Sequence, residues 1–106
     1  MTEETKNILC QRMSEKLLVF RTMLRLSQAD LAKKIGISRQ TVVSMESGKR
    51  PISWNTFLSL ILVFSKNQST NQLLKLYEIY TDELERYLFV GEEGDALLLP
   101  EQTNVI

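Results

Sequence analysis

Apolar residues recur at helical spacing along most of the chain. In residues 12–25 they fall three or four positions apart with basic residues between them, which predicts an amphipathic helix. This first stripe consists of Met13, Leu17, Phe20 and Leu24. Residues 53–65 and 69–88 carry similar stripes, so the pattern predicts helices there too. Thr81 and Asp82 offer a second helix start inside the last segment, which is therefore one helix or two.

Two short helices joined by a tight turn are predicted between the first stripe and the stripe of residues 53–65. Ser27, followed three residues later by Asp30, forms a variant of the capping box that begins a helix. That helix ends at Gly36, because glycine readily takes the left-handed conformation that a helix end often requires. Ser38 then caps the next helix, only two residues later. The sequence thus predicts a helix, a glycine turn and another helix.

The composition is that of one globular domain with its own core. The chain has 106 residues and a mass of 12.3 kDa, with 43% hydrophobic and 25% charged residues. The longest apolar run, residues 60–64, is far shorter than the roughly 20 residues of a membrane helix, and no signal-peptide pattern opens the chain. Cys10 is the single cysteine and is expected to be an inert thiol near a mobile amino terminus. We therefore expect a cytoplasmic protein that does not insert into a membrane.

The charges sum to zero but are distributed unevenly. Residues 1–50 carry ten Lys and Arg against five Asp and Glu, and residues 51–106 carry the opposite excess of five charges. Such asymmetry suggests an amino-terminal half that faces a polyanion, although a chance distribution is the alternative.

Residues 27–48 resemble the helix-turn-helix of the phage-repressor and Cro family, also called the xenobiotic response element family. The matching positions are Gln28, Ala32, Gly36, Ile37, Val42 and residues 45–48. The steep crossing of two helices joined by so short a turn requires a small residue such as Ala32. With its flanks, the resemblance covers about residues 13–66. It implies an all-α fold, a compact bundle of about five helices, with a repressor-like DNA-binding domain in residues 12–66 and an extension in residues 67–106.

The resemblance implies that the second helix of the motif enters the major groove of double-stranded DNA. The outward positions, which we expect to read bases, are Arg39, Gln40, Val43 and Ser44. Arginine can form two hydrogen bonds to guanine and glutamine two to adenine, each pair contributing about 1–3 kcal/mol of discrimination. The alternative is that these four side chains are only solvated surface.

Phosphate contacts are expected around the rim of this helix. The candidates are Gln28, Ser38, Thr41, Lys49 and Arg50. Gln28 opens a helix, where backbone donors and the helix dipole favour an anion. The family resemblance also implies a structural ion pair between Arg21 and Glu46.

Three classes of function remain from the sequence. The first is a transcriptional regulator, with repression expected, that binds a palindromic operator as a homodimer, because one recognition helix reads too few base pairs. The second is an adaptor or antitoxin whose residues 67–106 bind a partner protein, as suggested by their acidic balance and the apolar run of residues 96–99. A small hairpin is also predicted between residues 87–90 and this apolar run. The third is an enzyme, which we do not expect: the chain has no histidine, and we find no phosphate-binding glycine loop, no metal-binding pattern and no cofactor motif.

Overall fold

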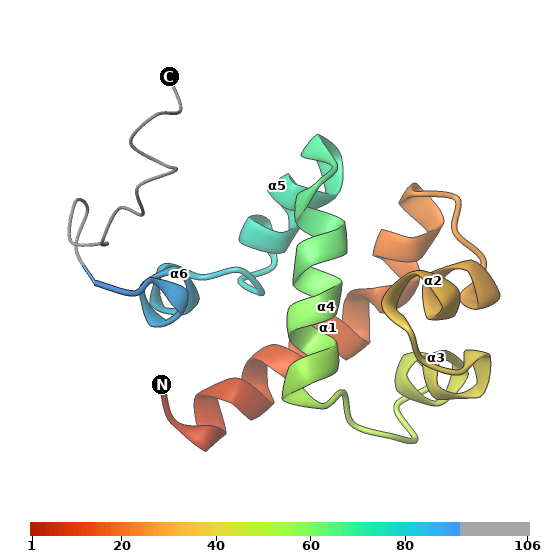
Figure 1. Ribbon diagram of the computed structural model, residues 1–106, viewed down its shortest axis with the longest axis horizontal. Coiled ribbons are helices and arrows are strands. Elements are labelled where there is room, and N and C mark those ends of the chain that lie inside the picture. Colours follow the sequence, from red (N-terminus) through yellow and green to blue (C-terminus); the bar gives the residue numbers. More distant parts are fainter. Residues whose placement is uncertain (92–106) are drawn as a thin grey trace, which may run out of the picture.

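The computed structural model describes residues 1–91, and all the regular secondary structure in this range is helical (Figure 1). The prediction of an all-α fold is confirmed. The helices are α1 (Glu3–Met23), α2 (Gln28–Ile35), α3 (Arg39–Glu46), α4 (Trp54–Ser65), α5 (Gln68–Leu76) and α6 (Asp82–Leu88). The described range thus has one helix more than the five expected, because the segment 69–88 divides into two.

Helix α1 is longer than its apolar stripe predicted. It begins at Glu3 rather than near residue 12, because the Thr2 side chain caps the helix by accepting a hydrogen bond from the Thr5 N–H. Cys10, expected near a mobile terminus, lies within this helix and is only 7% exposed. Burial also raises the pKa of the Cys10 thiol to about 11, so the neutral form predominates near neutral pH.

The predicted starts and turn of α2 and α3 are confirmed. Ser27 accepts from the Asp30 N–H and Asp30 accepts from the Ser27 N–H, which completes the capping box. These bonds lower the pKa of the exposed Asp30 carboxyl below its usual value. Gly36 ends α2 in the left-handed region at φ 80°, and the Ser38 side chain accepts from the Thr41 N–H to begin α3.

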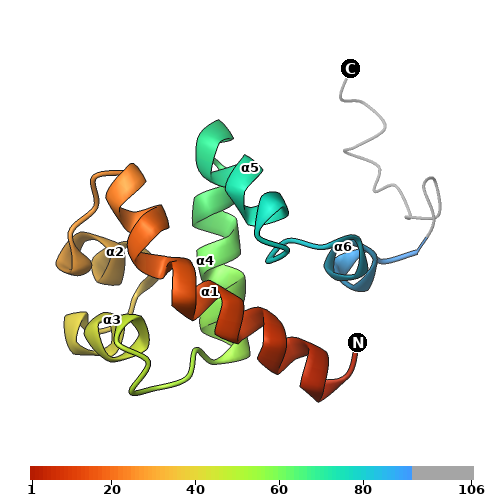
Figure 2. The ribbon, with the colours of Figure 1, turned by 180° about the vertical axis from the view of Figure 1, so that it is seen from behind.

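Helix α4 runs through the middle of the molecule, and α1 lies across it (Figure 2). Phe57 and Phe64 of α4 are fully buried, and the Phe64 ring stacks on Phe20 of α1 with ring centroids 4.9 Å apart. Leu62, on the opposite side of α4, is 60% exposed. The near-continuous apolar sequence of α4 therefore reflects its central position, with a remaining apolar surface at Leu62.

Helices α5 and α6 are separated by a left-handed turn at Glu78, which has φ 57°. Arg12 of α1 stabilises this turn, because its Nη1 donates a hydrogen bond to the Glu78 carbonyl oxygen at 2.8 Å. Thr81 then caps α6 by accepting from the Leu84 N–H. Leu74, Ile79 and Leu84 are completely buried in the same core as α1 and α4.

Two further observations complete the fold. None of the helices in the described part of the chain is long and apolar enough to cross a membrane. The predicted hairpin between residues 87–90 and 96–99 is wrong in its first half, because Tyr87 and Leu88 belong to the last turn of α6 and Phe89 and Val90 form no strand; residues 96–99 lie outside the described residues.

Candidate nucleic-acid interface

The α2–α3 pair is a small unit held by buried side chains between its helices and the core. Ala32 of α2 is 3% exposed, and Val42 and Met45 of α3 are at most 1% exposed. The N–H groups of Gly36 and Ile37 both donate to the Ala32 carbonyl oxygen, which closes the end of α2 before the chain turns into α3. The angle between the helices is therefore set by packing on one side and by a hydrogen-bonded turn on the other.

The opposite face of α3 carries the four expected base readers. Arg39 and Gln40 are exposed in its first turn, and Val43 and Ser44 are half-buried about one turn later. No hydrogen bond from the Arg39 or Gln40 side chain to any described residue is present. Their donors and acceptors are thus free to engage a ligand.

An ion pair between Arg21 and Glu46 anchors the end of α3 to α1. Arg21 Nε donates to Glu46 Oε2 at 2.7 Å, and Nη2 donates to Oε1 at 3.0 Å. The two side chains are 15% and 11% exposed. The hydrogen bond to Glu46 raises the pKa of Arg21 above its usual value, so the guanidinium stays charged. Because Nη1 also donates to the Leu26 carbonyl at 2.9 Å, the same guanidinium fixes the entrance to α2.

Gln28 joins this pair. Its Nε2 donates to Glu46 Oε1 at 3.3 Å, which links the first residue of α2 to the last residue of α3. The sequence suggested Gln28 only as a phosphate-binding residue, and this link to Glu46 was missed. The amide oxygen and the second amide hydrogen are not used in the link.

Ser14 was also missed by the sequence analysis. Its hydroxyl donates to the Met45 carbonyl oxygen at 2.7 Å, which satisfies a terminal acceptor of α3 from α1. The sequence signal is weak, since a serine within a helix usually faces solvent or bonds to its own backbone.

The remaining phosphate candidates surround α3. The Ser38 and Thr41 hydroxyls lie 2.8 Å apart in a hydrogen bond at its amino end. Lys49 and Arg50 are exposed in the loop after α3, and the backbone N–H groups of both donate to the Ser44 carbonyl at 3.0 and 3.2 Å. The structure thus places two hydroxyl groups at the amino end of α3. At its carboxyl end it places two cations on a loop that is hydrogen-bonded to the Ser44 carbonyl.

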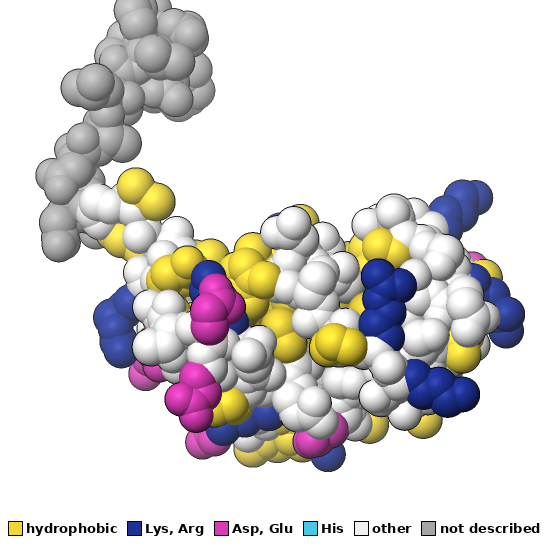
Figure 3. Space-filling model, turned by 90° about the horizontal axis from the view of Figure 1, so that it is seen from below, with side chains coloured by type: hydrophobic (Ala, Val, Ile, Leu, Met, Phe, Trp, Pro, Cys, Tyr) yellow, Lys and Arg dark blue, Asp and Glu magenta, His cyan; other side chains and the backbone are white. Residues whose placement is uncertain are grey.

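The surface charge is uneven in the same sense as the sequence. Figure 3 shows Lys and Arg side chains gathered at the right-hand end, which contains α2 and α3, while most visible Asp and Glu side chains lie toward the other end. A polyanion approaching the α2–α3 end therefore meets mainly positive charge. Within residues 1–91, no group of three or more His, Cys, Asp or Glu side chains is arranged to hold a metal ion.

Comparisons with known proteins agree with this geometry. Residues 19–64 match the family model described as Helix-turn-helix. A protein described as an uncharacterized HTH-type transcriptional regulator from Methanocaldococcus jannaschii is 51% identical over 37 residues, which are 35% of this chain and 56% of that protein. The chain thus matches only about half the length of this relative. No solved structure matches the chain.

The α2–α3 unit and its flanking helices are therefore similar to a helix-turn-helix domain over residues 19–64. Its resemblance to the phage-repressor and Cro type is confirmed by the family match.

Proposed function

We propose that this chain is a sequence-specific, double-stranded-DNA-binding transcriptional regulator, acting as a repressor. Residues 38–46 read the major groove, within a DNA-binding domain of residues 12–66. The observation that carries the proposal is the exposed and unpaired Arg39–Gln40 edge on a helix whose other end is tied to α1 and α2 through Glu46. A rigidly held edge with free donors and acceptors is what direct base readout needs, since each bidentate pair depends on exact orientation.

In this proposal Gln28, Ser38, Thr41, Lys49 and Arg50 bind phosphates and set the register of α3 on the duplex. Arg39 and Gln40 recognise guanine and adenine, while Val43 contacts a thymine methyl group and Ser44 a base or phosphate. The match to a helix-turn-helix model and the regulator named among the relatives support this assignment.

The regulator acts as a homodimer on a palindromic operator. Two recognition helices about 34 Å apart double the number of base pairs read, which one short helix cannot supply alone. Leu62 and Leu76 offer exposed apolar surface for the contact, at 60% and 71% exposure. Analytical ultracentrifugation at tens of micromolar, with and without operator, should show a dimer, and a monomer under both conditions would exclude this arrangement.

Selection of bound sequences from a random duplex pool tests the base-reading assignment. Arg39→Ala should lose preference for guanine at one position of each half-site, and Gln40→Ala should lose preference for adenine at another. Gln68→Ala at the exposed start of α5 is the matched control and should leave every preference unchanged. Weaker binding with unchanged sequence preference would show that Arg39 and Gln40 contact the DNA backbone rather than the bases. Absence of binding to any duplex at low salt would disprove the proposed function.

A second candidate function is an adaptor or antitoxin that binds a partner protein through residues 67–106. The observation favouring it is apolar surface at the end of the described chain, where Phe89 is 57% and Val90 92% exposed, with Leu76 on α5. Tagged full-length protein should recover a stoichiometric partner from the native cell, and Phe89→Glu should abolish recovery. Equal recovery by the Phe89→Glu variant would contradict this role for the surface.

A further inference from the structure

A hollow of about 590 Å³ lies where the end of α4, helix α5 and the start of α6 meet. This volume is in the range of small-molecule sites, which is roughly 300–1,000 Å³. The lining residues are Ser65, Asn71, Lys75, Glu78, Tyr80, Thr81, Asp82 and Glu85. None of them belongs to the α2–α3 unit or its loop, so the hollow is separate from the proposed DNA-binding surface.

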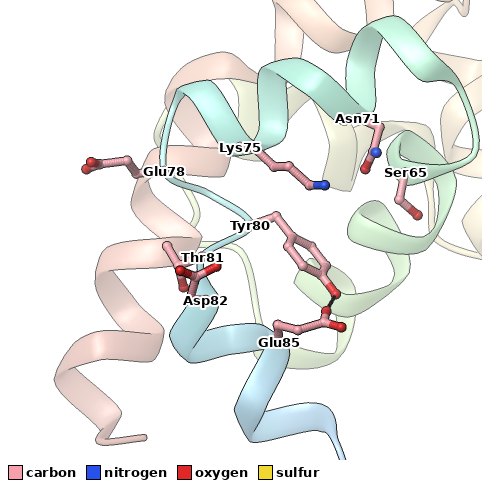
Figure 4. A pocket seen from close by; sticks show the side chains of 8 residues that line it. All are labelled: Ser65, Asn71, Lys75, Glu78, Tyr80, Thr81, Asp82 and Glu85. Carbon is pink, nitrogen blue, oxygen red and sulfur yellow. Dashed lines mark hydrogen bonds between the residues drawn. The ribbon is translucent and has the colours of Figure 1, made fainter.

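The polar groups of the hollow are divided by sign. Figure 4 shows Lys75 and Asn71 above the Tyr80 ring and Glu85 below it, while the Glu78 side chain points away. The upper part therefore offers an ammonium and an amide as donors, and the lower part offers a carboxylate. The ring between them gives a flat apolar wall.

The donors of the upper part have no partner among the described residues. Lys75 forms no ion pair there, and the Asn71 side chain forms no hydrogen bond. The lower part is fixed, because the Tyr80 hydroxyl donates to Glu85 Oε2 and leaves Oε1 open. This bond also raises the pKa of Tyr80 to about 12, so the phenol remains a donor at physiological pH.

We propose that this hollow binds a basic amino acid, with the ligand carboxylate at Lys75 and Asn71 and its cationic side chain at Glu85, along the Tyr80 ring. A carboxylate accepts charge-assisted hydrogen bonds from an ammonium and an amide, and a guanidinium both pairs with a carboxylate and stacks on an aromatic face. Asp82 and Glu85 outnumber Lys75 at the hollow, so a ligand with a net positive charge complements it better than a neutral one.

Calorimetric titration of the full-length chain at low salt tests the proposal with two probes. L-Arginine carries both charged groups, and agmatine is the same molecule without the carboxylate. We expect L-arginine to bind with a dissociation constant of about 1 mM or below and agmatine to bind about tenfold more weakly, as expected for loss of one charge-assisted pair. The proposal would be overturned if L-arginine gave no heat of binding at a concentration of about 20 mM, which is 20-fold above the expected dissociation constant. Equal affinities of the two probes would overturn it as well.

Two variants assign the two ends of the ligand. Lys75→Met should weaken L-arginine about tenfold but not agmatine, whereas Glu85→Gln should weaken both probes by a similar factor. Lys33→Met, which removes the same charge from the exposed side of α2, is the matched control and should change neither affinity. If Lys75→Met leaves the ratio of the two affinities unchanged, the carboxylate position is wrong. Thermal unfolding followed by circular dichroism checks that each variant is folded, and none of these measurements depends on DNA binding.

Discussion

Glu46 connects three parts of the helix-turn-helix unit through one carboxylate. It accepts from Arg21 of α1 and from Gln28 of α2 while ending α3 itself. Such a pair adds little net stability when complete, but removing one member leaves the other charge without its partner in a partly dry site. The end of α3 is therefore joined to both α1 and α2 through this one residue.

We predict that Glu46→Ala lowers the free energy of unfolding by about 3 kcal/mol, near the lower end of the cost of breaking a buried pair, because Arg21 keeps its bond to the Leu26 carbonyl. DNA affinity should fall too, since the recognition helix loses its anchor. Urea unfolding and fluorescence anisotropy measure the two effects. Glu15→Ala, an exposed carboxylate on α1, is the control and should change neither, and unchanged stability and affinity in Glu46→Ala would disprove the structural role of the pair.

Arg25 holds the left-handed conformation that follows α1, with φ 56°. The turn is closed by the Leu26 N–H donating to the Arg21 carbonyl at 3.0 Å, as in a helix end that normally carries glycine. Holding a residue with a side chain in the left-handed conformation costs about 1–2 kcal/mol, and glycine avoids this cost. About half of the stability gained in this way is lost again, because glycine makes the unfolded chain more flexible.

We therefore predict that Arg25→Gly stabilises the protein by about 0.5–1 kcal/mol, measured as a rise in the urea midpoint with an unchanged slope. Glu15→Gly, within α1, should show the opposite sign, because glycine in a helix interior costs about 1 kcal/mol. A lower midpoint for Arg25→Gly would show that the Arg25 side chain makes a stabilising interaction that outweighs the backbone strain.

At the scale of the element, the two helices of the motif meet around a side chain of one carbon. Ala32 is buried, while Ala29, one turn earlier on the same helix, is exposed. The same substitution at these two positions therefore separates the effect of helix packing from that of helix propensity, which is similar for leucine and alanine.

We predict that Ala32→Leu destabilises the fold by about 1–3 kcal/mol through overpacking and lowers DNA affinity further by changing the angle between α2 and α3. Ala29→Leu should leave both within about 0.5 kcal/mol of the parent, as surface substitutions usually do. Thermal unfolding and anisotropy titrations on both variants check this, and equal effects at the two positions would contradict the proposed crossing.

At the scale of the whole molecule, charge separates two ends. The α2–α3 end presents Lys49 and Arg50, whereas α6 and the turn before it carry Glu78, Asp82 and Glu83. A duplex bound at the first end keeps the acidic end away from its phosphates. For the proposed function, this arrangement lets a chain with zero net charge attract a polyanion at one end.

We predict a steep salt dependence of binding for the proposed dimer. With Lys49 and Arg50 as the cationic phosphate contacts of each protomer, and so about four in the dimer, the logarithm of affinity should fall against the logarithm of salt with a slope near −4. Lys49→Ala and Arg50→Ala should each reduce that slope by about 2, one contact per protomer, without changing sequence preference. Arg86→Ala, on α6, is the control and should keep the parent slope, and a slope near zero for the parent would exclude phosphate contacts as a source of affinity.

The sequence by itself determined the starts of α2, α3 and α4, the glycine turn at Gly36 and the resemblance to the helix-turn-helix family, whereas it left the start of α6 open as one of two alternatives. These features depend on contacts within a few residues, such as Ser27 with Asp30, so a single stretch of sequence contains them. The start of α1 at Glu3 belongs to the same class, but its threonine cap precedes a turn with no apolar stripe and was therefore missed.

Only the tertiary structure decided which distant groups meet. The Arg12 bond to the Glu78 carbonyl joins residues 66 positions apart, and the link from Gln28 to Glu46 and the burial of Cys10 likewise depend on how the helices pack. The hollow beside Tyr80 exists because α5 ends in a left-handed turn and α6 begins at a new angle. Periodicity records which face of a helix is apolar, but it contains no information on which other helix covers that face, and the pairings follow from that choice.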